Sequence, residues 1–157
     1  MAKQPVRAGL PTQTVAENLK RLRAAGGVSV RELSRLTGNA VPPNGISEIE
    51  NGLRRVDVDD LIALSAALDV SPSVLLMPRP DLPDEDGDGV VYLDPEDPLT
   101  ARQVWDWLTA ARLLTNAAMV ERLEEDDDND PALDAQEREL WRQRNLPKFA
   151  RKGAPDG

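Results

Sequence analysis

The sequence contains no cysteine and no histidine among its 157 residues, and aromatic residues make up only 3%. Without cysteine the chain can form neither disulfides nor cysteine-based zinc sites. Without histidine it lacks the commonest general base and the commonest metal ligand. We find no nucleophile–base pair and no phosphate-binding loop, and therefore expect no enzyme, no catalytic residues, no cofactor and no metal.

Long apolar runs are also missing. No segment approaches the roughly 20 apolar residues that a membrane-spanning helix needs, and the N-terminus lacks the apolar core of a signal peptide. We therefore expect a cytoplasmic protein. With few aromatic residues, its core has to be built from Leu, Val, Ile and Ala, which favours small helices.

The net charge of −9 hides an asymmetry. Residues 1–80 hold 10 Lys/Arg and 8 Asp/Glu, whereas residues 81–157 hold 9 and 20. A polyanionic partner therefore belongs to the first half of the chain. The acidic second half needs its own explanation, and the run "EEDDDND" at 124–130 is too charged to pack.

Five short helices are expected between residues 12 and 78, because apolar residues recur there at helical spacing between caps and stops. Capping boxes begin at Thr14 and Ser29, and Pro43 suits the first turn of a helix. Asp57 and Ser71 are expected N-caps. The five segments start at Thr14, Ser29, Pro43, Asp57 and Ser71 and end near Gly26, Gly38, Gly52, Leu68 and Pro78.

We therefore predict an all-α protein in which a five-helix domain is followed by an acidic linker and a helical extension. A helix is expected from Leu99 or Thr100 to about Leu123, and a weaker one from Asp130. Only "VVYL" at 90–93 suggests a brief strand. The predicted regions are a flexible arm at 1–11, the helical domain at 12–78, a Pro/Asp/Gly linker at 79–98, a helical region at 99–146 and a basic tail at 147–157.

The linker resembles part of a calcium loop. Asp84, Asp86, Asp88 and Gly89 stand at loop positions 1, 3, 5 and 6. Pro95 stands at position 12, where a bidentate glutamate is required. We therefore interpret the segment as an acidic linker.

Four motifs follow one another in the helical domain: Leu-x-x-Leu-Arg, Ser-x-x-Glu-Leu, Ile-x-x-Ile-Glu-Asn-Gly and Leu-x-Val-Ser-Pro. This ordered series resembles the phage-repressor-like (Cro/XRE) helix-turn-helix family over residues 14–77. The turn "GNAVPP" resembles those of a branch common in actinobacteria. It is about two residues longer than the usual turn.

The resemblance implies that the helix from Pro43 lies in the DNA major groove and reads base edges. Asn44 can then bond to adenine and Glu48 to cytosine, and Pro43 can contact a thymine methyl group. The implied base-reading residues are Pro43, Asn44, Gly45, Ser47 and Glu48.

The resemblance also implies phosphate contacts from the start of the second helix and from the loop after the third. These contacts fall on Ser29, Asn51, Arg54 and Arg55. Val30 replaces the glutamine that usually touches the DNA backbone in this family, so one contact is expected to be lost.

A structural ion pair between Arg23 and Glu50 is implied as well. Because the reading helix carries no Lys or Arg, tight binding would need a homodimer, formed through the fifth helix, the sixth helix or both.

Two functions remain open at this point. The first is a sequence-specific transcriptional regulator, such as a repressor, that binds double-stranded DNA. The second is an interaction protein, such as an antitoxin or adaptor, whose acidic half binds a basic protein or RNA polymerase. The Trp105/Trp107 helix could serve as a core anchor, a dimer seam or a ligand site.

Overall fold

The computed structural model describes residues 9–81, 85–111, 136, 139–140, 143–144 and 146–147. The chain divides into two compact units, residues 1–101 and 102–157. Residues 1–8 of the arm expected at 1–11 and residues 148–157 of the tail expected at 147–157 lie outside the described residues, as do most residues of the helices expected beyond residue 111.

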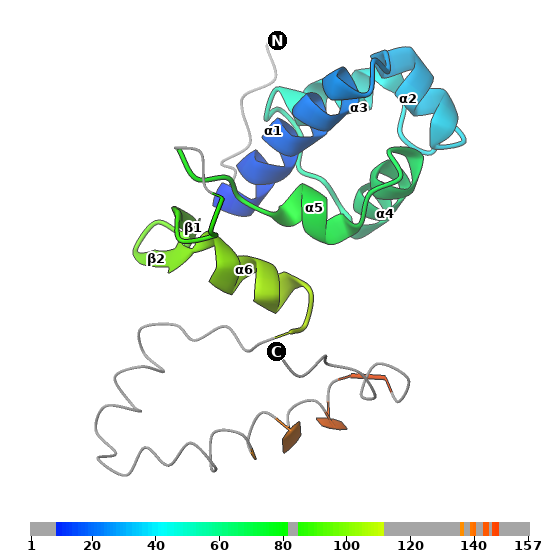
Figure 1. Cartoon of the computed structure of the whole chain (residues 1–157). Coiled ribbons are helices and arrows are strands. Elements are labelled where there is room, and N and C mark those ends of the chain that lie inside the picture. Colours follow the sequence, from blue (N-terminus) through cyan, green and yellow to red (C-terminus); the bar gives the residue numbers. More distant parts are fainter. Residues whose placement is uncertain are drawn as a thin grey trace. The chain divides into compact units, whose positions relative to one another are not determined.

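Five helices form the first part of the N-terminal unit (Figure 1). Helix α1 packs against α3 and α5, and α2 packs against α3 and α4. Their bounds are α1 Leu10–Ala25, α2 Val30–Leu36, α3 Pro43–Glu50, α4 Val58–Ala67 and α5 Pro72–Leu76.

The core of these helices consists of branched aliphatic side chains, as the low aromatic content requires. Every helix contributes at least one of them, so no helix buries its apolar face alone. The fully buried members are Leu19, Leu33, Val41, Ile46, Ile49, Leu64 and Leu75.

Helix starts follow the capping residues at two of the expected positions. The Ser29 hydroxyl accepts a hydrogen bond from the Glu32 amide at 3.1 Å, and the Asp57 carboxylate accepts one from the Asp60 amide at 2.8 Å. The expected start at Thr14 is wrong, because α1 begins four residues earlier at Leu10. Pro11 lies in the first turn there, where its missing N–H costs no helical hydrogen bond.

Asn18 is a buried polar residue on α1, with 2% of its surface exposed. Its amide donates to the carbonyl oxygens of Leu75 at 3.1 Å and Met77 at 2.8 Å. These carbonyls lie at the end of α5, where a helix leaves its acceptors without intrahelical partners. Asn18 therefore ties the last short helix to the first one.

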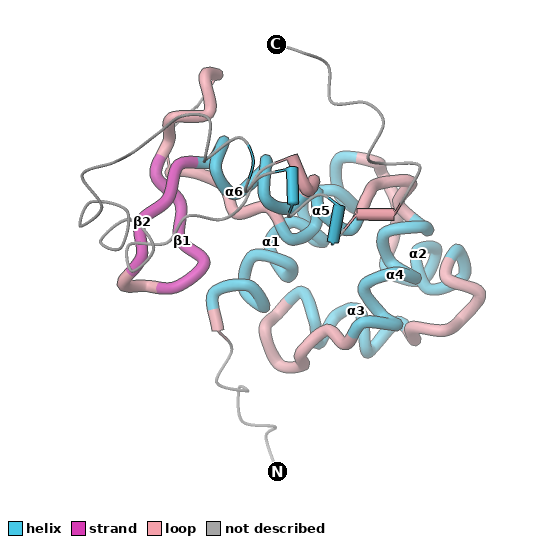
Figure 2. The backbone as a smooth tube through the Cα atoms, turned by 90° about the horizontal axis from the view of Figure 1, so that it is seen from below, coloured by secondary structure: helices cyan, strands magenta, loops and turns pink. Residues whose placement is uncertain are grey.

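The all-α prediction is wrong in one respect, because two antiparallel strands follow α5 (magenta in Figure 2). Strand β1 covers Val90–Asp94 and β2 covers Asp97–Thr100. The buried residues Val91 and Leu99 lie opposite each other, and β1 packs against α1. The expected linker at 79–98 is thus partly a hairpin.

The hairpin turn explains this error. The Asp94 carboxylate accepts a hydrogen bond from the Glu96 amide at 3.0 Å, an Asx turn that reverses the chain around Pro95. The same Asp and Pro residues give the segment its linker-like composition. The apolar pairing across the turn, and not the composition, decided the local structure.

Helix α6 covers Ala101–Leu108 and is shorter than expected. It ends because Ala110 adopts a left-handed conformation with φ 59° and the Ala111 amide donates to the Asp106 carbonyl at 2.7 Å. Alanine gives no sequence signal for such a stop. Trp105 and Trp107 on α6 are 40% and 41% exposed.

Beyond α6, the described residues 136, 139–140 and 143–144 are helical. The Gln143 amide donates to the Glu139 carboxylate at 3.0 Å, a pairing typical of one helix face. Within the described part of the chain, no helix is both long and apolar enough to cross a membrane.

Replacing Asn18 with alanine should lower the free energy of unfolding by about 1–3 kcal/mol, because the Leu75 and Met77 carbonyls lose their donor. Chemical denaturation measures this loss. Asn44→Ala, at an exposed position, is the control and should change stability by less than about 0.5 kcal/mol. Equal stability of Asn18→Ala and the wild type would contradict the assigned role.

Candidate nucleic-acid interface

Helix α3 starts abruptly behind two prolines. Pro42 is its N-cap, in an extended conformation, and Pro43 occupies the first helical position. Ile46 and Ile49 are 0% and 1% exposed and fix the inner face of the helix. The opposite face of α3 is therefore the part that is available to a partner.

The residues expected to read bases differ in their exposure. Pro43 and Asn44 are exposed, Ser47 and Glu48 are half-buried, and Gly45 is buried. Positions 43, 44, 47 and 48 share one side of a helix with 3.6 residues per turn. The structure thus brings four of the five together on one face.

The turn before α3 is fixed by hydrogen bonds of Thr37 and by the burial of Val41. The Thr37 hydroxyl donates to the Ser34 carbonyl at 2.7 Å and accepts from the Val41 amide at 3.3 Å. Val41 itself is fully buried. Gly38 and Asn39 both adopt positive φ, which lets the chain reverse in this short space. The sequence does not mark Val41 as a core residue, because its only signal is an apolar side chain between turn residues.

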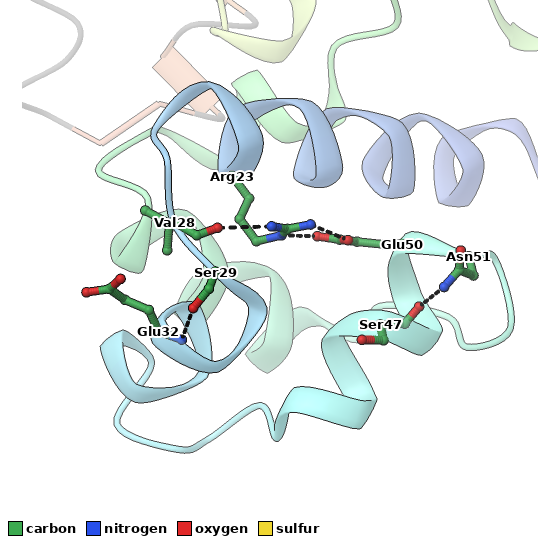
Figure 3. A network of polar contacts seen from close by, with 7 residues as sticks. All are labelled: Arg23, Val28, Ser29, Glu32, Ser47, Glu50 and Asn51. Atoms are coloured by element: carbon green, nitrogen blue, oxygen red, sulfur yellow. Dashed lines mark hydrogen bonds and ion pairs between the residues drawn. The ribbon is translucent and has the colours of Figure 1, made fainter.

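The far end of α3 is fixed by an ion pair (Figure 3). Arg23 on α1 donates to both carboxylate oxygens of Glu50, at 2.6 and 2.9 Å, and to the Val28 carbonyl at 2.9 Å. These are the two residues that the family resemblance pairs. The side chain of Glu50 is only 6% exposed.

The contact with Glu50 favours the charged form of Arg23. The hydrogen bond to Glu50 raises the pKa of the Arg23 guanidinium above its ordinary value, and the negative charge of Glu50 adds to this, whereas partial burial opposes it. Arg23 therefore remains a cation, and a two-pronged bond of this kind fixes direction as well as distance. The pair orients the C-terminal end of α3 relative to α1.

Two of the expected phosphate contacts already have partners within the domain (Figure 3). Ser29 caps α2 through the Glu32 amide. The Asn51 side-chain amide donates to the Ser47 carbonyl at 2.7 Å, and the same carbonyl also accepts from the Asn51 backbone amide at 3.2 Å. Each side chain keeps further hydrogen-bonding capacity, because a hydroxyl can still donate and an amide has a second N–H.

The two arginines after α3 lie in different surroundings. Arg55 is exposed. Arg54 instead forms an ion pair with Asp60, in the first turn of α4, and its Nη1 atom lies 2.7 Å from where a Cβ on Gly45 would be. This arrangement cannot be predicted from the sequence, because nothing in the spacing of Arg54 and Asp60 distinguishes a salt bridge from two solvated charges.

Asp60 is the acidic residue of this second pair and is 7% exposed. Burial raises the pKa of its carboxyl group, the Arg54 charge opposes that rise, and Asp57 and Asp59 add to it. Arg54 therefore offsets the cost of keeping a carboxylate buried here.

Removing one partner of the Arg23–Glu50 pair should destabilise the domain by about 3 kcal/mol, because the other charge is left buried and unpaired. The double variant Arg23→Met/Glu50→Leu should lose less than the sum of the single variants. A double-mutant cycle by chemical denaturation measures this. Strictly additive losses would show that the two residues do not act as a pair.

Comparison with protein families supports the helix-turn-helix arrangement. A family model described as helix-turn-helix matches residues 19–75. A solved structure of the restriction-modification controller protein C.AhdI from Aeromonas hydrophila is 30% identical, over 41% of this chain and 94% of that one, with a TM-score of 0.38. No curated protein matches the chain. Residues 19–75 therefore form a helix-turn-helix domain of the Cro/XRE type.

Proposed function

We propose that the protein is a sequence-specific transcriptional regulator that binds a short operator with helix α3. The observation that carries this proposal is the polar face of α3. The helix is fixed by the buried side chains of Ile46 and Ile49 on its inner face and by the bond of Arg23 to Glu50 at its C-terminal end. A helix presented in this way suits the major groove, which is wide enough to admit one.

The exposed groups on α3 differ in what they can recognise. The Asn44 amide can bond to N6 and N7 of adenine, and the Glu48 carboxylate can accept from N4 of cytosine. Pro43 offers an apolar surface to a thymine methyl group, and Ser47 can bond to several bases. We propose that these side chains specify the operator.

Phosphate contacts position such a helix without reading sequence. We propose that Arg55 makes the main charged contact, since its side chain is exposed just after α3. Ser29 and Asn51 would add neutral hydrogen bonds from the start of α2 and the end of α3.

We further propose that the regulator acts as a homodimer. Helix α3 carries two carboxylates and no Lys or Arg, so one domain attracts DNA only weakly. Exposed apolar residues on α4, Val58 at 74% and Ile62 at 53%, offer a surface that a second copy would cover. Two domains on a two-fold symmetric site make twice as many DNA contacts as one domain, and each domain keeps its own set of contacts.

The acidic residues 81–157 support a second candidate, an interaction protein that binds a basic protein or RNA polymerase. Under that alternative, DNA binding would be autoregulatory or absent. The two candidates differ in whether the full-length protein selects a DNA sequence.

Selection of bound duplexes from a random pool by full-length protein at low salt should enrich a two-fold symmetric motif, because two copies of α3 would read two half-sites. Sequencing of the enriched pool measures this. No enrichment by protein that is folded by circular dichroism would contradict the proposal and favour the second candidate.

On the selected operator, Asn44→Ala and Glu48→Ala should each cost about 1–3 kcal/mol and relax the preference at one base position. Arg55→Ala is the matched control, because it should weaken binding to all sequences alike and flatten the salt slope by about one unit. Binding titrations at several salt concentrations separate the two effects. Unchanged affinity and preference in Glu48→Ala would show that this residue does not read a base.

A further inference from the structure

The guanidinium of Arg54 pairs with a carboxylate of its own domain, whereas a phosphate-binding arginine has to direct its guanidinium toward the DNA. Arg54 lies in the loop after α3, four residues beyond Glu50, and its guanidinium pairs with Asp60. Asp60 is nearly buried, and Asp57 caps its backbone amide at 2.8 Å. The acidic partner is thus held in a fixed position at the start of α4.

The same guanidinium lies against the start of α3. Its Nη1 atom would be 2.7 Å from a Cβ at Gly45, closer than real Cβ contacts come. Gly45 is buried although it lies in the first turn of the helix. The absence of a side chain at 45 therefore leaves the space into which Arg54 fits.

We propose that Arg54 is a positioning residue, which sets the orientation of α3 by seating against Gly45 and pairing with Asp60. The assignment rests on the proposed function, since the orientation matters for reading DNA. It removes Arg54 from the expected phosphate contacts. It also gives Gly45 a role inside the domain, in place of the base-reading role that the family resemblance implies.

The geometry explains why this position needs an arginine. A planar guanidinium offers several N–H donors in a fixed fork, so it can bond to a carboxylate while a flat side rests on backbone. A lysine ammonium at the same place would keep the charge but not the shape. The charge also offsets the burial of Asp60, which two further acidic residues, Asp57 and Asp59, make less favourable.

A cycle of Gly45→Ala, Arg54→Ala and the double variant tests the contact by thermal unfolding. Gly45→Ala alone should lower the melting temperature, because the new methyl group displaces the guanidinium from Asp60. In the Arg54→Ala background it should leave the melting temperature unchanged or raise it, since alanine favours a helix over glycine. Equal effects of Gly45→Ala in both backgrounds would overturn the contact.

Operator binding tests the positioning role. In folded protein, Arg54→Ala should weaken binding to the selected operator at least about tenfold without changing the salt slope, and Arg54→Lys should restore only part of the affinity. Gly45→Ala, which keeps the arginine, should weaken binding in the same way. Arg55→Ala is the control and should flatten the slope by about one unit.

The outcomes separate this inference from the function on which it rests. A flatter salt slope in Arg54→Ala, like that of Arg55→Ala, would show a direct phosphate contact and overturn the positioning role. Full operator affinity in Arg54→Ala would overturn it as well. Failure of the wild-type protein to bind any duplex would refute the proposed function. The thermal unfolding cycle would still test the contact between Arg54 and Gly45.

Discussion

An eight-residue helix cannot persist in water on its own hydrogen bonds, so α3 depends on the side chains that hold it. Ile46 and Ile49 bury its inner face, and the Arg23–Glu50 pair fixes its last turn. Helix α1, of 16 residues, is the longest described and carries both Arg23 and the core residue Leu19. The position of the candidate reading face is therefore determined by the contacts of α3 with the neighbouring helices, α1 and α2 among them, and not by the propensity of α3 itself.

Two ion pairs near the ends of α3 have a common design. Each joins an arginine to a carboxylate that is less exposed than the arginine, with Glu50 at 6% and Asp60 at 9% of their side chains. Because a buried carboxylate is costly without a partner, each pair resists rearrangement more than it adds stability. In a DNA reader such a trade is useful, since a small change in helix direction misplaces every base contact.

The charge distribution favours specificity over general attraction. On the proposed function, a reading helix with two carboxylates and no cation would gain little from DNA as a polyanion, so binding would depend on matched base edges. Such a helix benefits from a second copy on a two-fold site. The strongly acidic residues 81–157 would weaken non-specific binding further, because they repel phosphates at low salt.

The sequence by itself determined the helical segments from Ser29 to Pro78, because caps, glycine stops and helical spacing are local signals. It also indicated the Arg23–Glu50 pair through a family motif. Only the tertiary structure decided four further features. They are the bond of Asn18 on α1 to the end of α5, the burial of Val41, the β1–β2 hairpin and the contact of Arg54 with Gly45. Each of these depends on residues brought together from different elements, and no local pattern encodes which polar or charged side chain turns inward.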